Sequence, residues 1–527
     1  MVQQLLHQGL WSPFVRRVSA PLLVFVVAAG VSTVGAGGVS IWTDEAVSIS
    51  AASRDWPQLW QLLQRIDAVH GVYYGLLKVW ITVFGLSPLS IRFLSALAVG
   101  GTALGVFVLC CRYVSARSAM VAALLCAVLP RMTWAGIEGR PFALSALAAV
   151  WVTVAFSTAL LRPRPVSWVS YGLFACAGVY ANVYLALLVM AHGVTVLIGH
   201  RQHPRVWGGY VIAGAAAAIA SLPLIMLARS QQAQVGEDGE RGIVGLLRRI
   251  LINQNFLGET PSLNPLSFIG TAPAEPYPGW FTLAWQGSAI VAAATGVVLI
   301  TVGTLRTVPG DREKRALITV VLPWAVLPPV LVAGYAMVIA PMYQPRYFTF
   351  AAPAVAVLVA FGVRVMWRHG VGRVVVCLFV VACLVVVGSQ RVPYAKSGSD
   401  WASAAQVVAA QAQRGDGVYY APNRRSDDPS QYNARRMAVG YPLAYAGLDD
   451  VTMEASGADT ATFDGTSIRL ADAQERVIEH DRVWAVYMRS TDPAILSADR
   501  GLFTEWGYEG RTVWRGPGSI VIEYARR

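Results

Sequence analysis

Two adjacent carboxylates, Asp44 and Glu45, follow directly on the first long apolar stretch of the sequence. This position corresponds to the mouth of a membrane helix, where an ionisable side chain is costly unless it faces water, a cavity or a cationic ligand. A carboxylate there can take a proton from a hydroxyl group, as general-base catalysis requires. The alternative interpretation is that both residues only mark the membrane interface and cap the next helix.

Other polar side chains recur at the ends of later apolar stretches. Arg140 follows closely after Glu138, and Arg346 lies in a short connection between two apolar runs. Arginine suits a phosphate group because its planar guanidinium donates two parallel hydrogen bonds. His70 and Tyr343 are further candidates for contacts to a phosphate. We therefore expect an anionic substrate group beside the carboxylates.

Each of these side chains also has a purely structural interpretation. In that interpretation Glu138 and Arg140 pair with each other at a helix end, and Arg346 extends toward lipid headgroups. His70 is then an interfacial histidine with satisfied hydrogen bonds, and Tyr73 and Tyr74 belong to an aromatic belt.

The composition indicates a membrane protein with many spans. Hydrophobic residues make up 55% of the 527 residues and charged residues 14%, and the apolar runs are too long and too many for one soluble core. Residues 1–390 carry 26 Lys and Arg against 12 Asp and Glu, whereas the chain from Arg391 on carries 16 against 18. Positive charge in short loops sets membrane topology rather than recruiting nucleic acid. The ratio of 39 arginines to three lysines is typical of GC-rich genomes such as those of actinobacteria.

The apolar stretch 70–86 decides the topology. If it lies along the membrane surface, the arginine-rich loops all fall on the side of Arg16 and Arg17, and a crossing would put those loops outside, against the positive-inside rule. We therefore expect a cytoplasmic N-terminus, an uncleaved first helix and two juxtamembrane helices in the first outer loop. The first of them, 56–63, has apolar residues on one face and Asp55 as a cap.

Eleven spans follow from this choice, and they leave the segments with Asp44, Glu138 and Arg346 together on the outer side. The expected spans are 19–40, 89–112, 117–132, 139–161, 166–181, 183–200, 207–228, 283–304, 317–339, 347–366 and 371–389. Proline before Arg346 disfavours helix at Gln344, so Arg346 is expected to open the next helix at the interface.

The last part of the chain, 391–527, has the charge content of a soluble domain. A helix is expected from Trp401 and a strand at Gly417, and this alternation predicts a small α/β domain outside the membrane. We therefore divide the chain into a transmembrane catalytic domain, 1–390, and an extracytoplasmic domain, 391–527. The sequence has no dinucleotide fingerprint or phosphate-binding loop, and none of its six cysteines suggests a disulfide framework or a zinc site.

Four segments, taken in order, resemble the landmarks of the GT-C glycosyltransferases related to protein O-mannosyltransferases and lipid A aminoarabinose transferases. They are Trp42–Ala46, Asp67–Tyr74, Ile137–Leu144 and Pro345–Phe348. The resemblance covers residues 20–390 and rests on the ordered set rather than on one motif. It implies a GT-C fold and an enzyme that moves a sugar from a polyprenyl-phosphate carrier to an acceptor outside the cytoplasmic membrane.

In such an enzyme Asp44 is the expected base of an inverting displacement, with Glu45 and Glu138 as neighbouring carboxylates. Arg346, Arg140, His70 and Tyr343 are then expected to bind the donor phosphate. Asp67, Tyr73, Tyr74 and Asn182 are expected to bind substrate. The sequence departs from the family pattern at Gly71 and Val72, where many relatives have prolines, and at Asn182, where relatives have a histidine.

The expected donor is a polyprenyl-phosphate sugar, with mannose first and arabinofuranose second. The acceptor, whether protein, glycolipid or cell-envelope glycan, is left open. No resident cofactor or metal site is expected, with a divalent cation near Glu138 as the open alternative.

Two other function classes compete with this one. A transporter or lipid flippase also places charges at membrane depth, but the sequence has no matched halves or paired broken helices. A non-catalytic scaffold with an outer binding domain gives no reason for Asp44, Glu138 and Arg346 to share one side.

Overall fold

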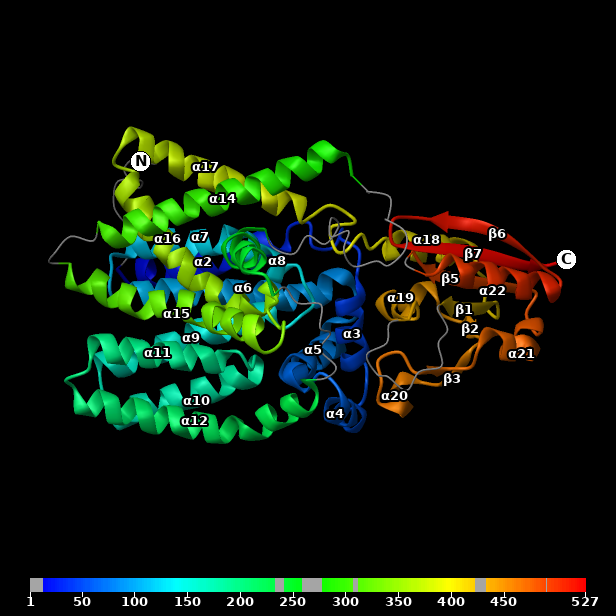
Figure 1. The fold of residues 1–527 in the computed structure, drawn as a ribbon, viewed down its shortest axis with the longest axis horizontal. Coiled ribbons are helices and arrows are strands. Elements are labelled where there is room, and N and C mark those ends of the chain that lie inside the picture. Colours follow the sequence, from blue (N-terminus) through cyan, green and yellow to red (C-terminus); the bar gives the residue numbers. More distant parts are fainter. Residues whose placement is uncertain (1–12, 233–240, 258–276, 307–310, 422–432, 490) are drawn as a thin grey trace, which may run out of the picture.

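A bundle of long helices forms most of the molecule, and a smaller domain with a sheet follows it at one end (Figure 1). The structure is a computed structural model that describes the whole chain except residues 1–12, 233–240, 258–276, 307–310, 422–432 and 490. The helices of the bundle are α2 (Pro13–Thr33), α6 (Pro88–Cys110), α7 (Ala116–Val128), α8 (Pro130–Gly136), α9 (Phe142–Leu161), α10 (Pro165–Ala181), α11 (Leu185–Gly199), α12 (Pro204–Ser230), α14 (Gly279–Leu305), α15 (Arg312–Val338), α16 (Ala352–Met366) and α17 (Gly370–Ser389).

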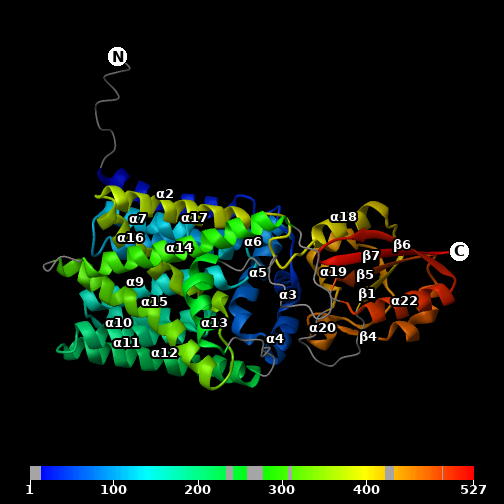
Figure 2. The ribbon, with the colours of Figure 1, turned by 45° about the horizontal axis from the view of Figure 1, so that its top comes forward.

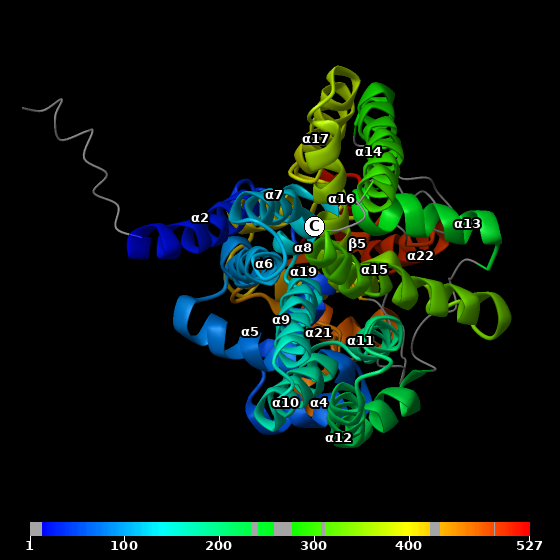
Figure 3. The same ribbon diagram turned by 90° about the vertical axis from the view of Figure 1, so that its left-hand side faces the viewer.

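Figure 3 looks along the bundle from the end opposite the small domain and shows its two sides. On one side α10, α11 and α12 lie together, and on the other α14 packs beside α17. The short helix α13 (Ile243–Arg248) continues into the π-helix η3 (Arg249–Leu257), which contacts α14 and α8. These two elements lie in the connection between α12 and α14.

By length and composition, seven segments of the described chain can cross a membrane: α6, α9, α12, α14, α15, the segment Pro345–Met366 and α17. All seven coincide with expected spans. The expected count of eleven is therefore confirmed only in part, because the other four spans are shorter or broken helices. One of these, 117–132, is two helices, α7 and α8, bent by 61°, and counting that pair as one span gives eight.

Single proline and glycine residues explain why two of the expected spans end or bend early. Leu129 precedes a proline and has extended angles (φ −63°, ψ 127°), because proline disfavours helix in the residue before it. The first helix, expected to reach residue 40, ends at Thr33. Gly35 follows with φ +74°, a left-handed conformation that glycine adopts readily.

Short helices lie between the end of the bundle and the small domain (Figures 1 and 2). They are α3 (Thr43–Ala52), α4 (Trp56–Arg65), the 3-10 turn η1 (Ala68–His70) and α5 (Gly71–Phe84). Both helices expected in this loop are confirmed as α4 and α5. Asp55 caps α4 as expected: its carboxylate accepts from the Gln58 amide (2.7 Å), and the Gln58 side chain accepts from the Asp55 amide (3.3 Å).

The small domain contains a five-stranded mixed sheet of order β2-β1-β5-β7-β6. Strand β1 pairs in parallel with β2 and β5, whereas β7 pairs antiparallel with β5 and β6. The strands of this sheet are β1 (Gly417–Ala421), β2 (Asp449–Asp450), β5 (Arg482–Met488), β6 (Tyr508–Arg515) and β7 (Ser519–Arg526). The other elements of the domain are α18 (Trp401–Gln411), α19 (Arg436–Gly440), β3 (Met453–Ala455), α20 (Gly457–Thr460), β4 (Thr466–Ser467), α21 (Gln474–Ile478) and α22 (Pro493–Glu505). The expected helix at 401 and strand at 417 are confirmed.

Helix α3 packs directly against the small domain. Buried side chains of α3, among them Ala46 and Ile49, share one apolar cluster with Trp401 and Met437. Ser50 of α3 donates a hydrogen bond to the Phe463 carbonyl (3.0 Å). The first loop of the bundle and the small domain therefore share one core.

Candidate functional site

Asp44 lies in the first turn of α3, at the junction of the bundle and the small domain. Its carboxylate accepts a hydrogen bond from Arg346 Nη1 at 2.9 Å, and both side chains are about a quarter exposed (23% and 24%). Trp42, the residue before the helix, is extended (φ −127°, ψ 175°), so the chain turns sharply into α3. The base and the phosphate ligand expected from the sequence thus lie in direct contact and are reachable from solvent.

Arg346 is placed by the turn that precedes α16. Gln344 is extended (φ −116°, ψ 121°), and Pro345 opens the 3-10 helix η6 (Pro345–Ala351). The expectation that Arg346 opens a helix after the proline is confirmed, although its first turn is 3-10 rather than α. Asn182 Nδ2 donates to the carbonyl of Tyr347 (3.4 Å), the residue after Arg346.

Asn182 lies in the expected break between two helices. It follows the last residue of α10 in an extended conformation (φ −161°, ψ 117°), and its side-chain oxygen accepts from the Tyr184 amide (3.0 Å). The Tyr184 ring stacks on Tyr347 with centroids 5.7 Å apart. Asn182 therefore supports the turn that carries Arg346 through main-chain and ring contacts.

Arg140 reaches the same place from the turn before α9. Its Nη1 donates to the Tyr74 hydroxyl (3.2 Å) and to the Asp44 carbonyl (3.4 Å). The Tyr74 hydroxyl in turn donates to Asp67 Oδ2 (2.8 Å). Arg140 therefore links α3 to α5, whereas the structural interpretation had it pair with Glu138.

Asp67 adopts a left-handed conformation (φ 58°, ψ 28°), which is uncommon for a residue with a side chain. A strained backbone conformation persists only where surrounding contacts hold it, and such residues cluster at functional sites. Here the adjacent Ala68 amide donates to the Gln231 side chain (3.0 Å), and the Asp67 carboxylate accepts from Tyr74.

The aromatic residues expected here are buried rather than lipid-facing. Tyr73 and Tyr74 are 2% and 0% exposed, which argues against an aromatic belt. The His70 ring meets the Tyr74 ring edge-on at 6.0 Å. Burial, followed by the nearby Arg140, lowers the pKa of His70 to about 4, so this imidazole is neutral at pH 7 and carries one N–H donor.

The charges around Asp44 keep it ionised. Burial on its own raises the pKa of the Asp44 carboxyl, but Arg346 and Arg140 outweigh that effect, and the pKa lies below its ordinary value. Arg436 of α19 also lowers it, and this arginine is held by a short ion pair with Asp464 (2.8 Å). Sequence reasoning missed Arg436, because nothing in the sequence placed α19 beside α3.

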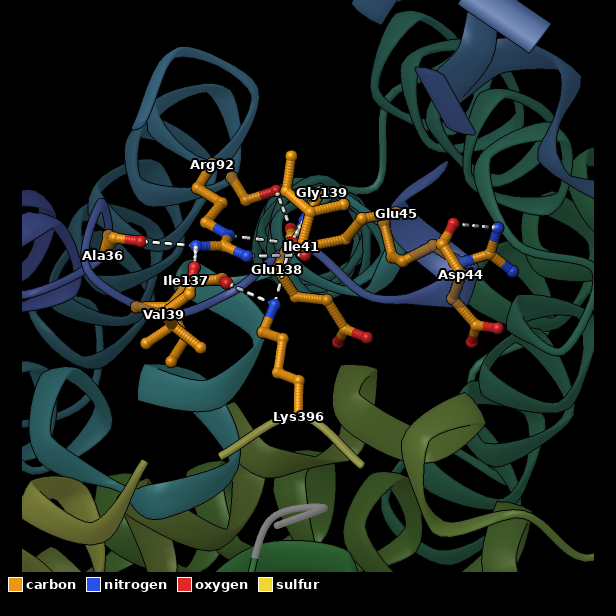
Figure 4. A network of polar contacts seen from close by, with 12 residues as sticks. Ala36, Val39, Ile41, Asp44, Glu45, Arg92, Ile137, Glu138, Gly139 and Lys396 are labelled. Carbon is orange, nitrogen blue, oxygen red and sulfur yellow. Dashed lines mark hydrogen bonds and ion pairs between the residues drawn. The ribbon is translucent and has the colours of Figure 1, made fainter. Parts of the chain in front are cut away.

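Glu45, the next residue, has a different environment. Its carboxylate is fully buried and accepts from Arg92 Nε (2.8 Å) and Nη2 (2.6 Å), from Lys396 Nζ (2.7 Å) and from the Gly139 amide (2.9 Å). Figure 4 shows these groups converging on Glu45, while the Asp44 side chain points away from them. Burial raises the pKa of Glu45, but Arg92 and Lys396 reverse this and hold it at about 2.

Arg92 and Lys396 are equally buried and were missed from the sequence. Arg92 donates to the carbonyls of Ala36 (2.5 Å) and Val39 (2.7 Å), and Lys396 donates to the Ile137 carbonyl (2.6 Å). A signal was present for each of them. Arg92 is a charge inside an expected span, which by itself suggests a function, and Lys396 is one of only three lysines.

Glu138 and Tyr343 make contacts of their own in the interior. Glu138 is fully buried, and its carbonyl accepts from Ser95 Oγ (2.6 Å); Figure 4 shows its carboxylate on the side of Lys396. The Tyr343 hydroxyl donates to Gln254 of η3, and its ring stacks on Phe348 with centroids 4.8 Å apart. Tyr343 is thus directed toward η3 rather than toward Asp44.

The structure brings Asp44, Arg346, Arg140, His70, Tyr74 and Asp67 together and leaves Glu45, Tyr73 and Tyr343 in adjoining buried networks. Within the parts of the chain that are described, no group of three or more His, Cys, Asp or Glu side chains has the spacing to hold a metal ion.

Part of the chain matches a known protein family. Residues 72–226 match the family model described as dolichyl-phosphate-mannose-protein mannosyltransferase. A search of the curated proteins finds no match.

Solved structures resemble the whole chain. ArnT from Cupriavidus metallidurans bound to undecaprenyl phosphate is similar at 12% identity, over 95% of this chain and 97% of that one, with a TM-score of 0.57. Its apo state gives 13% identity, the same coverage and a TM-score of 0.55. The oligosaccharyltransferase of Archaeoglobus fulgidus gives 14% identity, 95% and 73% coverage and a TM-score of 0.49.

The ArnT likeness extends over the bundle and the small domain alike, so the expected helical membrane bundle with a small C-terminal domain has an ArnT-like fold. The family match lies in the part of the bundle that contains Arg92 and Arg140. One part of the chain thus matches this family, and the chain over most of its length is similar in fold to ArnT.

Proposed function

We propose that this protein is a membrane glycosyltransferase of the GT-C class, which moves a sugar from a polyprenyl phosphate to an acceptor hydroxyl with Asp44 as the general base. The observation that carries the proposal is the partly exposed pair of Asp44 and Arg346, whose side chains meet at 2.9 Å. A carboxylate held ionised beside a guanidinium provides both charges that the reaction needs, one for the hydroxyl proton and one for the leaving phosphate.

The step is a direct displacement. The acceptor oxygen forms a bond to the anomeric carbon as the bond from that carbon to the phosphate oxygen breaks, and the configuration inverts. The hydroxyl proton passes to Asp44, and the lipid phosphate leaves with the electron pair. Arg346 and Arg140 stabilise its charge through guanidinium hydrogen bonds, and neutral His70 donates a further hydrogen bond.

Arg346 has two tasks in this scheme. Its Nη1 orients the Asp44 carboxylate, and its fixed positive charge stabilises the leaving phosphate. Glu45 and Glu138 flank the base, Glu45 as a positioning residue and Glu138 toward the substrate. Asp67, Tyr74 and Asn182 support the sugar and the turns around it.

Two of the comparisons support a polyprenyl-phosphate donor. The family description names dolichyl-phosphate mannose, and the ArnT structure holds undecaprenyl phosphate. Mannose is therefore the first sugar to test and arabinofuranose the second. The acceptor is a protein, a glycolipid or a cell-envelope glycan.

We place the site and the small domain on the extracytoplasmic side, with eleven crossings in residues 1–390 and the domain 391–527 outside. The support is the positive-inside rule applied to the arginine-rich loops. Reporter fusions at Gly85 and after Arg527 test it, because both should report the outer compartment. A cytoplasmic signal from either fusion would refute this orientation.

Turnover by the purified protein tests the donor class. A panel of polyprenyl-phosphate sugars, supplied without nucleotide, should include one substrate from which the wild-type protein transfers sugar and the Asp44→Asn variant does not. A requirement for GDP-mannose would overturn the proposal. Movement of the lipid across vesicles without sugar transfer would favour a flippase instead.

A further inference from the structure

Lys396 lies in the connection between α17 and α18, far in sequence from the rest of the site. Its side chain is fully buried, and its Nζ contacts Glu45 Oε1 (2.7 Å) and the Ile137 carbonyl (2.6 Å). The same ammonium lies 5.5 Å from the centroid of the Trp134 ring. A buried lysine with an acidic partner, a carbonyl and an aromatic face is a fixed element of the structure.

The groups that Lys396 holds are the chain neighbours of site residues. Glu45 follows Asp44, and Ile137 lies on the turn that leads to Arg140. Glu45 also accepts from the Gly139 amide, directly before Arg140. One ammonium therefore fixes both the first turn of α3 and the turn before α9, which carry the base and one of the two arginines beside it.

Two buried cations, Arg92 and Lys396, donate to the Glu45 carboxylate. Without Lys396 the carboxylate keeps Arg92, but the Ile137 carbonyl loses the ammonium that donates to it. A buried acceptor that loses its donor is costly, so the order of this turn should weaken.

We infer that Lys396 is a positioning residue for glycosyl transfer, which sets the Asp44 carboxylate against Arg346 by holding Glu45 and the turn at Ile137 from the connection to the small domain. This inference rests on the proposed function. Lys396 does not touch substrate in this scheme, so its loss should lower kcat while leaving the binding of the lipid phosphate to Arg346 largely intact.

The test compares Lys396→Met with a matched control, Lys314→Met. Lys314 also makes a short ion pair, with Asp311 at 2.5 Å, but at the start of α15 and partly exposed. Misplacing a catalytic group by about 1 Å costs up to about 100-fold in rate, so Lys396→Met should lose about 10- to 100-fold in kcat. The Kd for undecaprenyl phosphate should change less than about threefold by the same reasoning, and Lys314→Met should retain both values.

Each outcome decides the inference. A kcat of Lys396→Met equal to that of Lys314→Met overturns it, and so does a parallel loss of kcat and lipid binding, which marks a general structural role. If the wild-type protein transfers no sugar from any carrier, the proposed function itself fails, and the inference fails with it. A wild-type protein that turns over while Lys396→Met is unaffected refutes the inference alone.

The pH profile of kcat supplies a second readout. Burial lowers the pKa of Lys396 to about 8, against the opposing effect of Glu45 on α3 and Glu138 and together with the repulsion of Arg92 on α6. Proton loss above that pH should mimic the variant, so wild-type kcat should fall as the pH rises through about 8. The low kcat of Lys396→Met should not change there. A wild-type kcat that stays level across this range, or the same alkaline decline in both proteins, would contradict the assignment.

Discussion

Asp44 and Glu45 are the same kind of residue in adjacent positions, yet they have opposite environments. Asp44 is 23% exposed and meets one arginine, whereas Glu45 is fully buried between an arginine and a lysine. Successive residues of a helix point about 100° apart, so one turn of α3 presents one carboxylate to the site and the other to the interior. The comparison shows that a single helix turn can separate a partly exposed carboxylate from one that is committed to the interior.

Arg346, the partner of Asp44, and Arg92, the partner of Glu45, differ in exposure in the same way as the two carboxylates. Arg346 is partly exposed, and a pair of this kind is worth little to folding. Arg92 donates both to Glu45 and to main-chain carbonyls in the interior, and breaking such a pair is costly because a buried charge is left behind. The exposed pair is thus available for chemistry, and the buried pair is committed to structure.

The largest expected effect is the loss of transfer rate when Asp44, the exposed carboxylate, is replaced. Asp44→Asn keeps the shape of the side chain but removes the proton acceptor, so the transfer rate should fall by about 10²–10⁴-fold. Its thermal unfolding midpoint should change little, since a partly exposed ion pair contributes about 0–1 kcal/mol. Single-turnover transfer and differential scanning fluorimetry measure the two effects. A variant that keeps half its rate would exclude Asp44 as the base.

Replacing Glu45, the buried carboxylate, should mainly reduce stability. Glu45→Gln leaves Arg92 and Lys396 without their shared carboxylate, so the free energy of unfolding should fall by about 3–5 kcal/mol. The unfolding midpoint in detergent should drop accordingly, with Asp44→Asn as the matched control at the adjacent position. Equal midpoints for the two variants would show that the contrast between the carboxylates is not energetic.

Arg346 tests the donor side of the exposed pair. Arg346→Ala should weaken undecaprenyl phosphate binding by about 1.5–3 kcal/mol, the range of a hydrogen bond to a charged group, and calorimetric titration measures this. Arg346→Lys keeps the charge but loses the planar fork, so it should fall between alanine and wild type. If lysine serves as well as arginine and alanine has little effect, Arg346 only extends to bulk lipid.

The smallest expected effect is on the acid side of the pH profile. The pKa of Asp44 lies below its ordinary value of 3.8, so kcat/KM should stay level as the pH falls from 7 to about 4.5. The pKa of Glu45 is lowered from 4.5 to about 2, so its contribution to stability is complete above pH 4.5 and is lost as the pH falls through about 2. The protein should thus stay folded over the measured range. An acid limb near pH 6 would point to another base.

The sequence predicted much of the exposed group and little of the buried one. Asp44, Arg140 and Arg346 stand at the ends of apolar runs, where a charge is easily noticed. The partners of Glu45 could not be assigned, because they lie on another span and in the connection to the small domain. A network of contacts between residues 45, 92 and 396 leaves no local pattern.

The long spans of the fold were predicted from the sequence, but its bends and long-range packing were not. The seven long spans were found from hydropathy, because length and apolar composition are enough to define them. The bend at Leu129 and the early end of α2 depend on single proline and glycine residues within apolar runs. The packing of α3 on the small domain joins elements far apart in the chain, and such contacts do not follow from local periodicity.

The packing of α3 has a consequence for how the protein is made. The amide of Ile41, just before α3, donates to the hydroxyl of Tyr441 (2.8 Å), and Ser50 of α3 donates to the carbonyl of Phe463. The ribosome releases α3 early, but these partners emerge only near the end of translation. Nascent chains that stop at Ser389 therefore hold Asp44 on a helix whose partners in the small domain are still missing, and α3 can reach its final packing only when its last partners, in the final quarter of the chain, have been synthesised and have docked.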